Sequence, residues 1–374
     1  MNYIDGFRDP DVAAQFVRLI AEQGRELAAN GRHMHIMEVC GSHTMAIGRY
    51  GIRQLLPANV ELISGPGCPV CVTDPGYIDA AIALAGQGAI LATFGDMIRV
   101  PGSDSDLTEC RSAGGSVEVC YSPSAAVDLA RNHPDREVVF LAIGFETTIA
   151  PVVSLVGEAQ SAGVSNLSLL TAFKLVPPAL RALLTDKEIK IDAFLCPAHV
   201  SAIIGSKAYE PFAAEFHVPC VVAGFEPLDI LYGVHGILGQ ALKNEASVEN
   251  QYARVVRSEG NPVAQARIAK YLEPVDASWR GLGVIPASGL GLRPEFAAYD
   301  AEKKLGVPVR PGRLHPGCLC GEVIKGKLRP TSCPLFGKAC NPDHPVGPCM
   351  VSAEGTCAAY FKYGLPGERQ GGGK

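Results

Sequence analysis

The stretch FLAIGFETTIAP, residues 140–151, runs from a wholly apolar segment through Gly144 into a group of polar side chains. Strands buried on both faces of a parallel sheet have this continuous apolar character, and a glycine or proline loop commonly follows them. Comparable apolar runs lie at 34–40, 60–64, 89–94, 137–143, 167–171, 191–196 and 218–223. Alanine-rich stretches of helical character, such as 77–86 and 124–131, separate several of them. The alternation predicts an α/β fold with parallel sheets.

Six of these strand-to-loop junctions fall into two sets of three, which indicates an internal duplication of one α/β unit. The first set is MEVCGSHTMAI (37–47), ELISGPGCPVC (61–71) and ILATFGDMIRVPG (90–102); the second is FLAIGFETTIAP (140–151), DAFLCPAHVSAIIG (192–205) and CVVAGFEPLDILYG (220–233). The spacing agrees only between the second and third members, and strand-to-loop junctions resemble one another in general. If the duplication is real, the loops at the carboxyl ends of both sheets can face one cleft, where such folds bind ligands.

The length of 374 residues exceeds what one ordinary core holds, so we expect several domains. Two related parallel-sheet α/β domains are expected at residues 31–123 and 124–235. From residue 236 the composition becomes polar and helical, and then rich in glycine, proline and cysteine. We expect residues 236–374, joined by an N-terminal helix within 1–30, to form a C-terminal iron–sulfur domain. Asp9 and Pro10 predict the start of that helix, as N-cap and first helical residue.

Composition excludes some classes of function. The net charge is −5, with no polybasic run, which argues against binding to nucleic acid or to an anionic membrane. The N-terminus has no signal-peptide pattern, and no apolar run reaches the ~18 residues that a membrane-spanning helix needs. Thirteen cysteines in a chain without such a leader indicate the cytoplasm, where thiols more often bind metals or exchange electrons than form structural disulfides.

The strongest motif is a group of cysteines near the C-terminus. Cys318, Cys333, Cys340 and Cys357 have the spacing C-x14-C-x6-C-x16-C in a proline-rich segment. Four thiolates can enclose a [4Fe-4S] cluster or a zinc ion, and the absence of C-x2-C pairs here favours the cluster. Two more cysteines, at positions 320 and 349, are rival ligands. The alternative is a run of buried free cysteines without a metal.

A second thiol motif is GPGCPVC, residues 65–71, which places Cys68 and Cys71 at redox spacing. Sulfurs in a C-x-x-C turn can reach disulfide distance, and loop amides or a helix start lower the pKa of such thiols. The alternative is half of a zinc site that Cys40 and His43 complete. Redox exchange and zinc binding both remain open on spacing alone.

Cys40 and His43 follow the apolar run that ends in MEVCGSHT. A thiolate and an imidazole three residues apart on a strand-end loop can share a metal, or act as nucleophile and base. The alternative is a buried structural cysteine beside a surface histidine.

Other strand ends carry polar residues too, namely Asp96, Glu146 and His199. A single carboxylate or histidine on a loop is usually solvated, but repeated placement at strand ends favours a shared cleft for some of them. No phosphate-binding glycine motif accompanies them, so nucleotide binding has no support.

Taken in order along the chain, the motifs MEVCGSHT, SGPGCPVCV, TFGDMIRVPG, GFETT, CPAHVSAIIG, IPASGLGLRPEF and GCLCGEV…SCPLFGKAC…GPCMVSAEGTCAAY resemble the signatures of the HypD family of hydrogenase maturation proteins. The resemblance spans roughly residues 35 to 360. It implies a scaffold that, with the small chaperone HypC, builds the Fe(CN)2CO unit of [NiFe]-hydrogenases. HypE, loaded by HypF, would deliver the cyanide.

The resemblance also implies roles for individual residues. Cys40 would hold the transient Fe(CN)2CO iron beside a HypC cysteine, with His43 as a neighbouring ligand or orienting group. Cys68 and Cys71 would be the redox pair, and the four C-terminal cysteines would bind the [4Fe-4S] cluster. The family often has a second histidine two residues after the first, where this chain has Met45.

These roles describe a site for metallocentre assembly and redox chemistry rather than a conventional turnover enzyme. We count Asp96, Glu146 and His199 with Cys40, His43 and the redox pair as candidate catalytic residues. The principal alternative is a stand-alone iron–sulfur or thiol–disulfide oxidoreductase acting on a small substrate. A zinc-stabilised interaction scaffold without chemistry is the third possibility.

Overall fold

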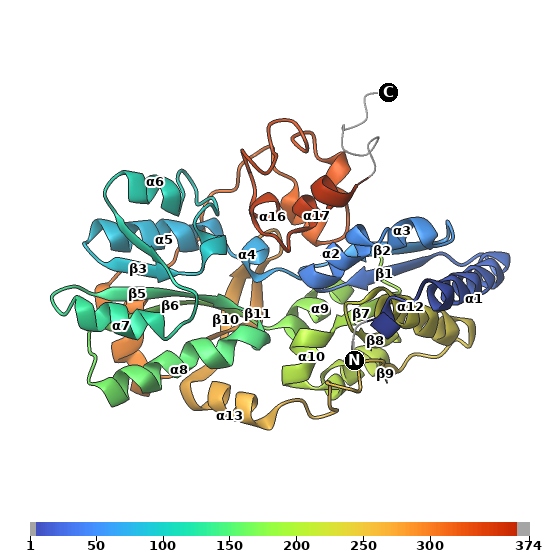
Figure 1. The fold of residues 1–374 in the computed structure, drawn as a ribbon, viewed down its shortest axis with the longest axis horizontal. Coiled ribbons are helices and arrows are strands. Elements are labelled where there is room, and N and C mark those ends of the chain that lie inside the picture. The colour runs from blue at the N-terminus through green and yellow to red at the C-terminus, as the bar shows by residue number, and fades with distance from the viewer. Residues whose placement is uncertain (1–4, 365–374) are drawn as a thin grey trace.

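The computed structural model describes residues 5–364 and contains two β-sheets, one towards each end of its longest axis (Figure 1). All five strands of the first sheet are parallel, and their spatial order is β2–β1–β7–β8–β9. They are β1 (Met34–Glu38), β2 (Val60–Ser64), β7 (Ala193–Pro197), β8 (Cys220–Ala223) and β9 (Val248–Asn250).

The second sheet has six strands in the order β10–β11–β6–β5–β3–β4. They are β3 (Ile90–Thr93), β4 (Ser116–Val119), β5 (Val138–Gly144), β6 (Leu167–Lys174), β10 (Leu272–Trp279) and β11 (Gly283–Leu292). Strands β3 to β6 are parallel, whereas β11 is antiparallel to both β6 and β10. All seven residues of β5 are buried, as the unbroken apolar run predicts. The expected α/β class with two mostly parallel sheets is confirmed.

The two sheets share one strand order. When the parallel strands of each sheet are numbered as the chain meets them, both begin 2-1-3-4. In such a sheet the order reverses between the first and third strands, and ligands bind at the carboxyl ends beside that reversal. The reversal lies between β1 and β7 in the first sheet and between β3 and β5 in the second. Each sheet therefore has one preferred place for a site.

The sheets do not follow the predicted boundary between residues 123 and 124. The first sheet takes β1 and β2 from the segment 31–123 and β7 and β8 from the segment 124–235, and the second sheet also draws on both. The chain leaves the first sheet after β2 and returns to it at β7. Local alternation of strands and helices is the same in either sheet, so it does not reveal which strands pair.

The N-terminal helix begins as predicted and packs against a helix that covers the first sheet. Helix α1 (Pro10–Ala29) starts after Asp9, whose carboxylate accepts hydrogen bonds from the amides of Asp11 and Val12. Its buried residues Ile20 and Leu27 belong to the core of the first sheet, where α1 lies against α12 (Pro227–Leu242) (Figure 1). The sequence predicted that this helix joins residues 236–374, and α12, its main contact, itself extends into that range. The apolar face of α1 packs against α12, which covers the same sheet.

The C-terminal segment lies across the junction of the two sheets. Its short helices are α15 (Cys320–Ile324), η5 (Pro330–Ser332), α16 (Pro348–Val351) and α17 (Thr356–Tyr363). Figure 1 shows it, in orange and red, above α4 (Pro69–Val72) and α2 (Gly41–Arg49), which α16 and α17 respectively contact. Residues 365–374 of the predicted C-terminal domain lie outside the described residues.

The remaining helices connect the strands and cover the sheets. They are η1 (Asp5–Phe7), α3 (Ile52–Leu55), α5 (Pro75–Gly86), η2 (Gly95–Met97), α6 (Leu107–Ser112), α7 (Ala125–Asn132), α8 (Glu146–Ala162), α9 (Val176–Thr185), α10 (Ala198–Ile204), η3 (Ser206–Tyr209), α11 (Glu210–Phe216), α13 (Pro262–Tyr271), η4 (Pro294–Tyr299) and α14 (Ala301–Leu305). Between residues 5 and 364, no helix has both the length and the apolar character required to cross a bilayer.

Candidate functional site

The strand reversal of the first sheet gathers three of the predicted residues. Cys40 precedes α2 just after β1, His43 lies in the first turn of α2, and His199 lies in the first turn of α10 after β7. The ring of Phe225, from the loop after β8, is 4.8 Å from the ring of His43 and 4.3 Å from that of His199. Phe225 therefore links the two histidines at the edge of the sheet where Cys40 also lies.

Cys40 is held between two loops and is almost buried. The amide of Gly41 donates to the carbonyl of Gly67 (3.0 Å), so the loop after β1 is joined to the loop that leads to Cys68. Gly67 is required at this contact, because a Cβ there would lie 2.4 Å from the Cys40 nitrogen. Burial, and then the carboxylate of Glu354, raises the pKa of Cys40 to about 12. Without a metal this side chain is a neutral thiol at pH 7.

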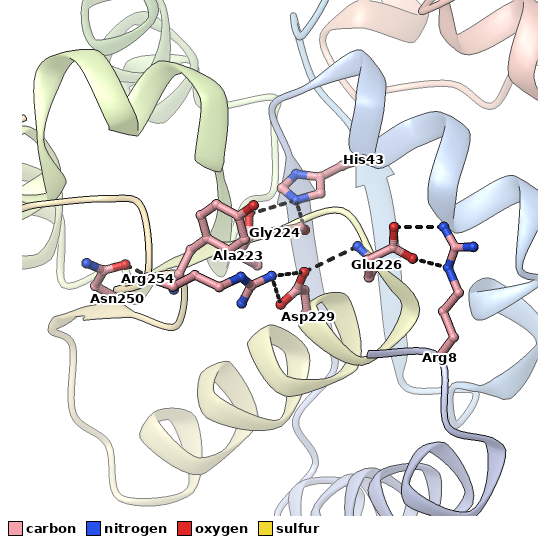
Figure 2. A network of polar contacts seen from close by, with 9 residues as sticks. Arg8, His43, Ala223, Gly224, Glu226, Asp229, Asn250 and Arg254 are labelled. Carbon is pink, nitrogen blue, oxygen red and sulfur yellow. Dashed lines mark hydrogen bonds and ion pairs between the residues drawn. The ribbon is translucent and has the colours of Figure 1, made fainter. Parts of the chain in front are cut away.

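His43 is fully buried, and its hydrogen bonds identify its tautomer. Nε2 lies 2.8 Å from the carbonyl oxygen of Gly224 and 3.2 Å from that of Ala223 (Figure 2). Carbonyl oxygens only accept, so Nε2 carries the hydrogen and Nδ1 has the free lone pair. Burial lowers the pKa of His43 to about 4, which keeps the ring neutral. Nδ1 has no hydrogen-bond partner among the described residues, so it is a buried donor atom available to a metal.

Glu354 completes this edge of the sheet and was missed by the sequence analysis. Its carboxylate accepts a hydrogen bond from the Ser42 hydroxyl (2.8 Å), and its charge acts on both Cys40 and His199. A Cβ at Gly41 would lie 2.4 Å from the Glu354 Cβ and carbonyl oxygen, so the C-terminal segment lies directly on the start of α2. In the sequence, Glu354 lies three residues before Cys357, and this short separation could have predicted that it lies near the cysteines.

Glu38 was also missed, although a carboxylate inside the apolar run HIMEVC is unusual. It is fully buried, accepts a hydrogen bond from Thr44 Oγ1 (2.7 Å) and lies 3.8 Å from an Arg53 nitrogen. Its Oε2 lies 3.5 Å from the Cys40 amide nitrogen. Burial raises the pKa of Glu38 to about 7, with the nearby charge of Arg53 opposing the shift. The carboxyl group therefore supports the loop that carries Cys40.

The sulfurs of Cys68 and Cys71 lie 2.6 Å apart at the start of α4. Cys68 Sγ also accepts the Cys71 amide (3.2 Å) and donates to the Ser352 hydroxyl (3.3 Å). Burial, followed by contacts with Cys349 and Cys68, raises the pKa of the Cys71 thiol well above its ordinary value. The geometry is that of a pair able to form a disulfide.

Six cysteines of the C-terminal segment line a single small cavity. They are Cys318, Cys320, Cys333, Cys340, Cys349 and Cys357, and the apolar side chains of Val323, Leu335, Phe336 and Met350 complete the lining. Within residues 5–364, no three His, Cys, Asp or Glu side chains are already arranged to hold one metal ion. The donor set nevertheless fits an iron–sulfur cluster, because soft thiols converge in an apolar enclosure. Contact with Cys320, and then burial, raises the pKa of the Cys318 thiol above its ordinary value, and the charge of buried Arg280 partly opposes that shift.

The redox-spaced pair is not remote from these cysteines. Although Cys71 follows β2 of the first sheet, its side chain contacts that of Cys349. Cys349 in turn contacts Cys320 and Cys357. The pair therefore reaches the C-terminal cysteines although it lies on a loop of the first sheet, because α16 packs against α4.

Asp96 and Glu146 lie at the carboxyl edge of the second sheet. Asp96 is exposed in η2 after β3, whereas Glu146 is buried at the start of α8. One oxygen of Glu146 accepts the Val176 amide (2.9 Å), and the other has no partner among residues 5–364. Burial raises the pKa of Glu146 to about 7. In the part of the chain that is described, no hydrogen bond or ion pair joins either carboxylate to Cys40, His43, Cys68 or Cys71.

The fold and the site together define an α/β protein with two sheets. Its thiol groups lie close together where the C-terminal segment packs across the junction of those sheets. The chain belongs to the HypD family of hydrogenase maturation factors. The model of that family, described as the hydrogenase formation hypA family, matches residues 13–364. The hydrogenase maturation factors HypD of Rhizobium leguminosarum and Azotobacter vinelandii are 46% and 45% identical to this chain, over 97% of it and 96% and 97% of their own lengths. The HypD protein of Cupriavidus necator is 43% identical over 97% of both chains.

Proposed function

We propose that this chain is the scaffold on which the Fe(CN)2CO unit of [NiFe]-hydrogenases is assembled. A HypC-type chaperone would supply a second iron-binding cysteine, and HypE, loaded by HypF, would supply cyanide. We place the reaction in the cytoplasm, where thiols stay reduced. The observation that carries the proposal is that the segments bearing three groups of thiols contact one another. Cys40, the Cys68–Cys71 pair and the six-cysteine cavity are joined through Gly67, Ser352 and Cys349.

Iron enters this scheme as cargo, and Cys40 is its proposed anchor. Low-spin iron(II) that carries cyanide and carbon monoxide prefers soft, anionic donors such as thiolates. Because the pKa of the buried Cys40 thiol is raised to about 12, binding of iron must release its proton. The carboxylate of Glu354 lies near this thiol, where it accepts a hydrogen bond from Ser42. His43 Nδ1 offers a second, neutral donor on the same edge of the sheet.

The resident cofactor in this proposal is a [4Fe-4S] cluster. Cys318, Cys333, Cys340 and Cys357 would hold it, since all four line the cavity. When bound, such a cluster supplies electrons singly. The other two cysteines of the cavity would stay free, and Cys349 would remain in contact with Cys71.

The Cys68–Cys71 pair would store two electrons as a dithiol and release them as it forms a disulfide. Its sulfurs are already adjacent, so oxidation needs little movement of the backbone. The same pair also fits the alternative function, a stand-alone oxidoreductase for a small substrate. The partner proteins and the fate of the iron separate the two functions.

The test uses protein purified without oxygen from cells that express the partner proteins. Infrared spectra of the wild-type complex should show cyanide and carbonyl stretches, and Cys40→Ser should lose them while keeping its iron–sulfur absorbance. A hydroxyl is a harder and less acidic donor than a thiol, so it should not replace the thiolate. Cys110→Ser is the matched control, since Cys110 is a buried cysteine of α6. Retention of both bands in Cys40→Ser would place the iron elsewhere. A wild-type chain that binds no partner and shows no bands, yet reduces disulfides, would favour the alternative.

A further inference from the structure

The orientation of His43 depends on a loop without regular structure. Its Nε2–H group donates to the carbonyls of Ala223 and Gly224, where β8 ends. Residues 224–226 then lead to α12, and backbone pairing does not fix their position. Side-chain contacts must therefore hold the Gly224 carbonyl in place.

Asp229, in the first turn of α12, makes the first of these contacts. It is 5% exposed, and its carboxylate accepts the Glu226 amide (3.3 Å), while the Glu226 side chain caps the helix in return. A Cβ at Gly224 would lie 2.2 Å from Asp229 Oδ2, so the carboxylate packs directly on the residue whose carbonyl holds His43. A displacement of the Asp229 carboxylate would therefore also displace Gly224.

Arg254 holds Asp229 from the other side (Figure 2). One guanidinium nitrogen lies 2.8 Å and 2.7 Å from the two carboxylate oxygens of Asp229. The guanidinium is also 4.0 Å from the rings of Phe7 and of Tyr252, both favourable cation–π distances. The side chain of Asn250 closes the turn that carries Arg254 by donating to the Val256 carbonyl (2.8 Å). Without Arg254 a nearly buried carboxylate would lose its counter-charge, which is strongly unfavourable.

We propose that the Arg254–Asp229 pair positions His43. The pair fixes the Gly224 carbonyl, that carbonyl keeps the hydrogen on Nε2, and Nδ1 therefore presents its lone pair to the ligand. Hydrogen bonding at one imidazole nitrogen commonly orients the other towards a metal. The inference rests on the proposed function and deepens it, since it names the nitrogen of His43 that would bind the iron, but the tautomer can be measured in the protein without iron.

The first measurement is nuclear magnetic resonance of the full chain with 15N-labelled histidine, kept reduced and without added iron. The His43 signals are identified by their loss in His43→Gln. The wild type should show one neutral form, with a Nε2–H proton that exchanges slowly with water. Arg254→Gln should raise that exchange rate by about tenfold or more, as expected when a hydrogen bond to a charged group is lost. Arg254→Lys should restore part of the protection, because it keeps the charge without the planar fork.

Arg181→Gln is the matched control. Arg181 also forms a two-point ion pair, with Glu215, and also lies over two aromatic rings, those of Phe212 and Phe216. Its loss should leave the His43 signals unchanged. If Arg254→Gln does not fold, Asp229→Asn removes the ion pair while keeping the side-chain size, and the same shift is expected. A protonated His43 or a Nδ1–H form in the wild type would overturn the proposal. So would unchanged protection in the variants that fold.

Infrared spectra of the partner-bound protein separate the two proposals. One outcome is that the wild type lacks the cyanide and carbonyl bands while Arg254→Gln still speeds exchange of the His43 Nε2–H proton. In that case the proposed function fails and the positioning role of the Arg254–Asp229 pair stands. If the wild type carries the bands, Arg254→Gln should shift or weaken them while Arg181→Gln does not. Identical bands and identical His43 signals in Arg254→Gln and the wild type would overturn the positioning role alone.

Discussion

The side chain of Cys71, at the end of the redox-spaced turn, lies against that of Cys349 in the C-terminal segment. The two belong to different parts of the fold, since Cys71 is in α4, after β2 of the first sheet, and Cys349 is in α16. Thiols in contact can exchange hydrogen bonds and, when oxidised, disulfide partners. The contact therefore makes the pair and the six-cysteine cavity one connected group of sulfurs.

The first prediction concerns the ligands of the cluster. Protein purified without oxygen should contain about four irons, and Cys→Ala at 318, 333, 340 or 357 should lose them, since each change removes one of four thiolates. Cys320→Ala and Cys349→Ala should keep the cluster. Iron content and visible absorbance measure this, with Cys110→Ala as the control for loss of a buried cysteine. Loss of iron in Cys320→Ala together with retention in Cys318→Ala would reverse the assignment.

The second prediction concerns the redox pair. In a graded redox buffer, Cys68 and Cys71 should convert between dithiol and disulfide while the iron content stays constant. Native alkylation of Cys71 should be slow, because the side chain is 2% exposed and burial raises its pKa. Mass spectrometry after alkylation reports both properties. Cys68→Ser should abolish the transition and Cys110→Ser should not; stoichiometric zinc bound at the pair would contradict a redox role.

The third prediction concerns the buried carboxyl group of Glu146. Its pKa is raised by burial to about 7, so the stability it contributes is present below the ordinary value and is lost as the pH rises through 7. Glu146→Gln keeps an acceptor for the Val176 amide but cannot ionise. It should therefore stabilise the fold at pH 8 by roughly 1–3 kcal/mol relative to the wild type, and by much less at pH 5.

Urea denaturation at several pH values checks the Glu146 prediction. Glu245→Gln is the control, because Glu245 is exposed and its change removes a carboxylate from the surface rather than from the core. A pH-independent effect of Glu146→Gln would mean that the carboxyl group does not ionise in this range.

The fourth prediction concerns the closure of the C-terminal segment over Cys40. Gly41→Ala should displace Glu354, since a Cβ there would lie 2.4 Å from its Cβ and carbonyl oxygen. Overpacking of this kind typically costs about 1–3 kcal/mol. Alkylation of Cys40 should become faster at the same time. Gly86→Ala is the control, as nothing lies within 4 Å of its added Cβ. Unchanged stability and unchanged Cys40 reactivity in Gly41→Ala would show that the segment does not close on the site.

Local features of the fold were predictable from short stretches of sequence. The start of α1 follows from Asp9 and Pro10, because a capping side chain and a proline act within a few residues. The buried β5 follows from an unbroken apolar run. The predicted boundary at residues 123 and 124 does not coincide with the division of strands between the two sheets, since strand pairing between distant segments leaves no mark in local alternation.

The sequence predicted most residues of the candidate site, but it did not predict which of them lie next to one another. Cys40, His43 and His199 were expected at strand ends, and the strand order of the first sheet brings their loops to one edge. Asp96 and Glu146 had the same local appearance, yet their strands pair in the other sheet. Arg254 and Asp229 carried no motif, because their role comes only from packing against the loop after β8.

The sequence by itself determined the chemistry available to this protein: thiols in a proline-rich segment, a C-x-x-C turn, and a cysteine and histidine after an apolar strand. These depend on covalent order and on turns a few residues long. Only the tertiary structure decided that Cys71 meets Cys349 and that Glu354 lies on Gly41. The physical reason is that such contacts require remote segments to pack together. Their positions are set by the order of strands in two sheets and by the burial of side chains between them.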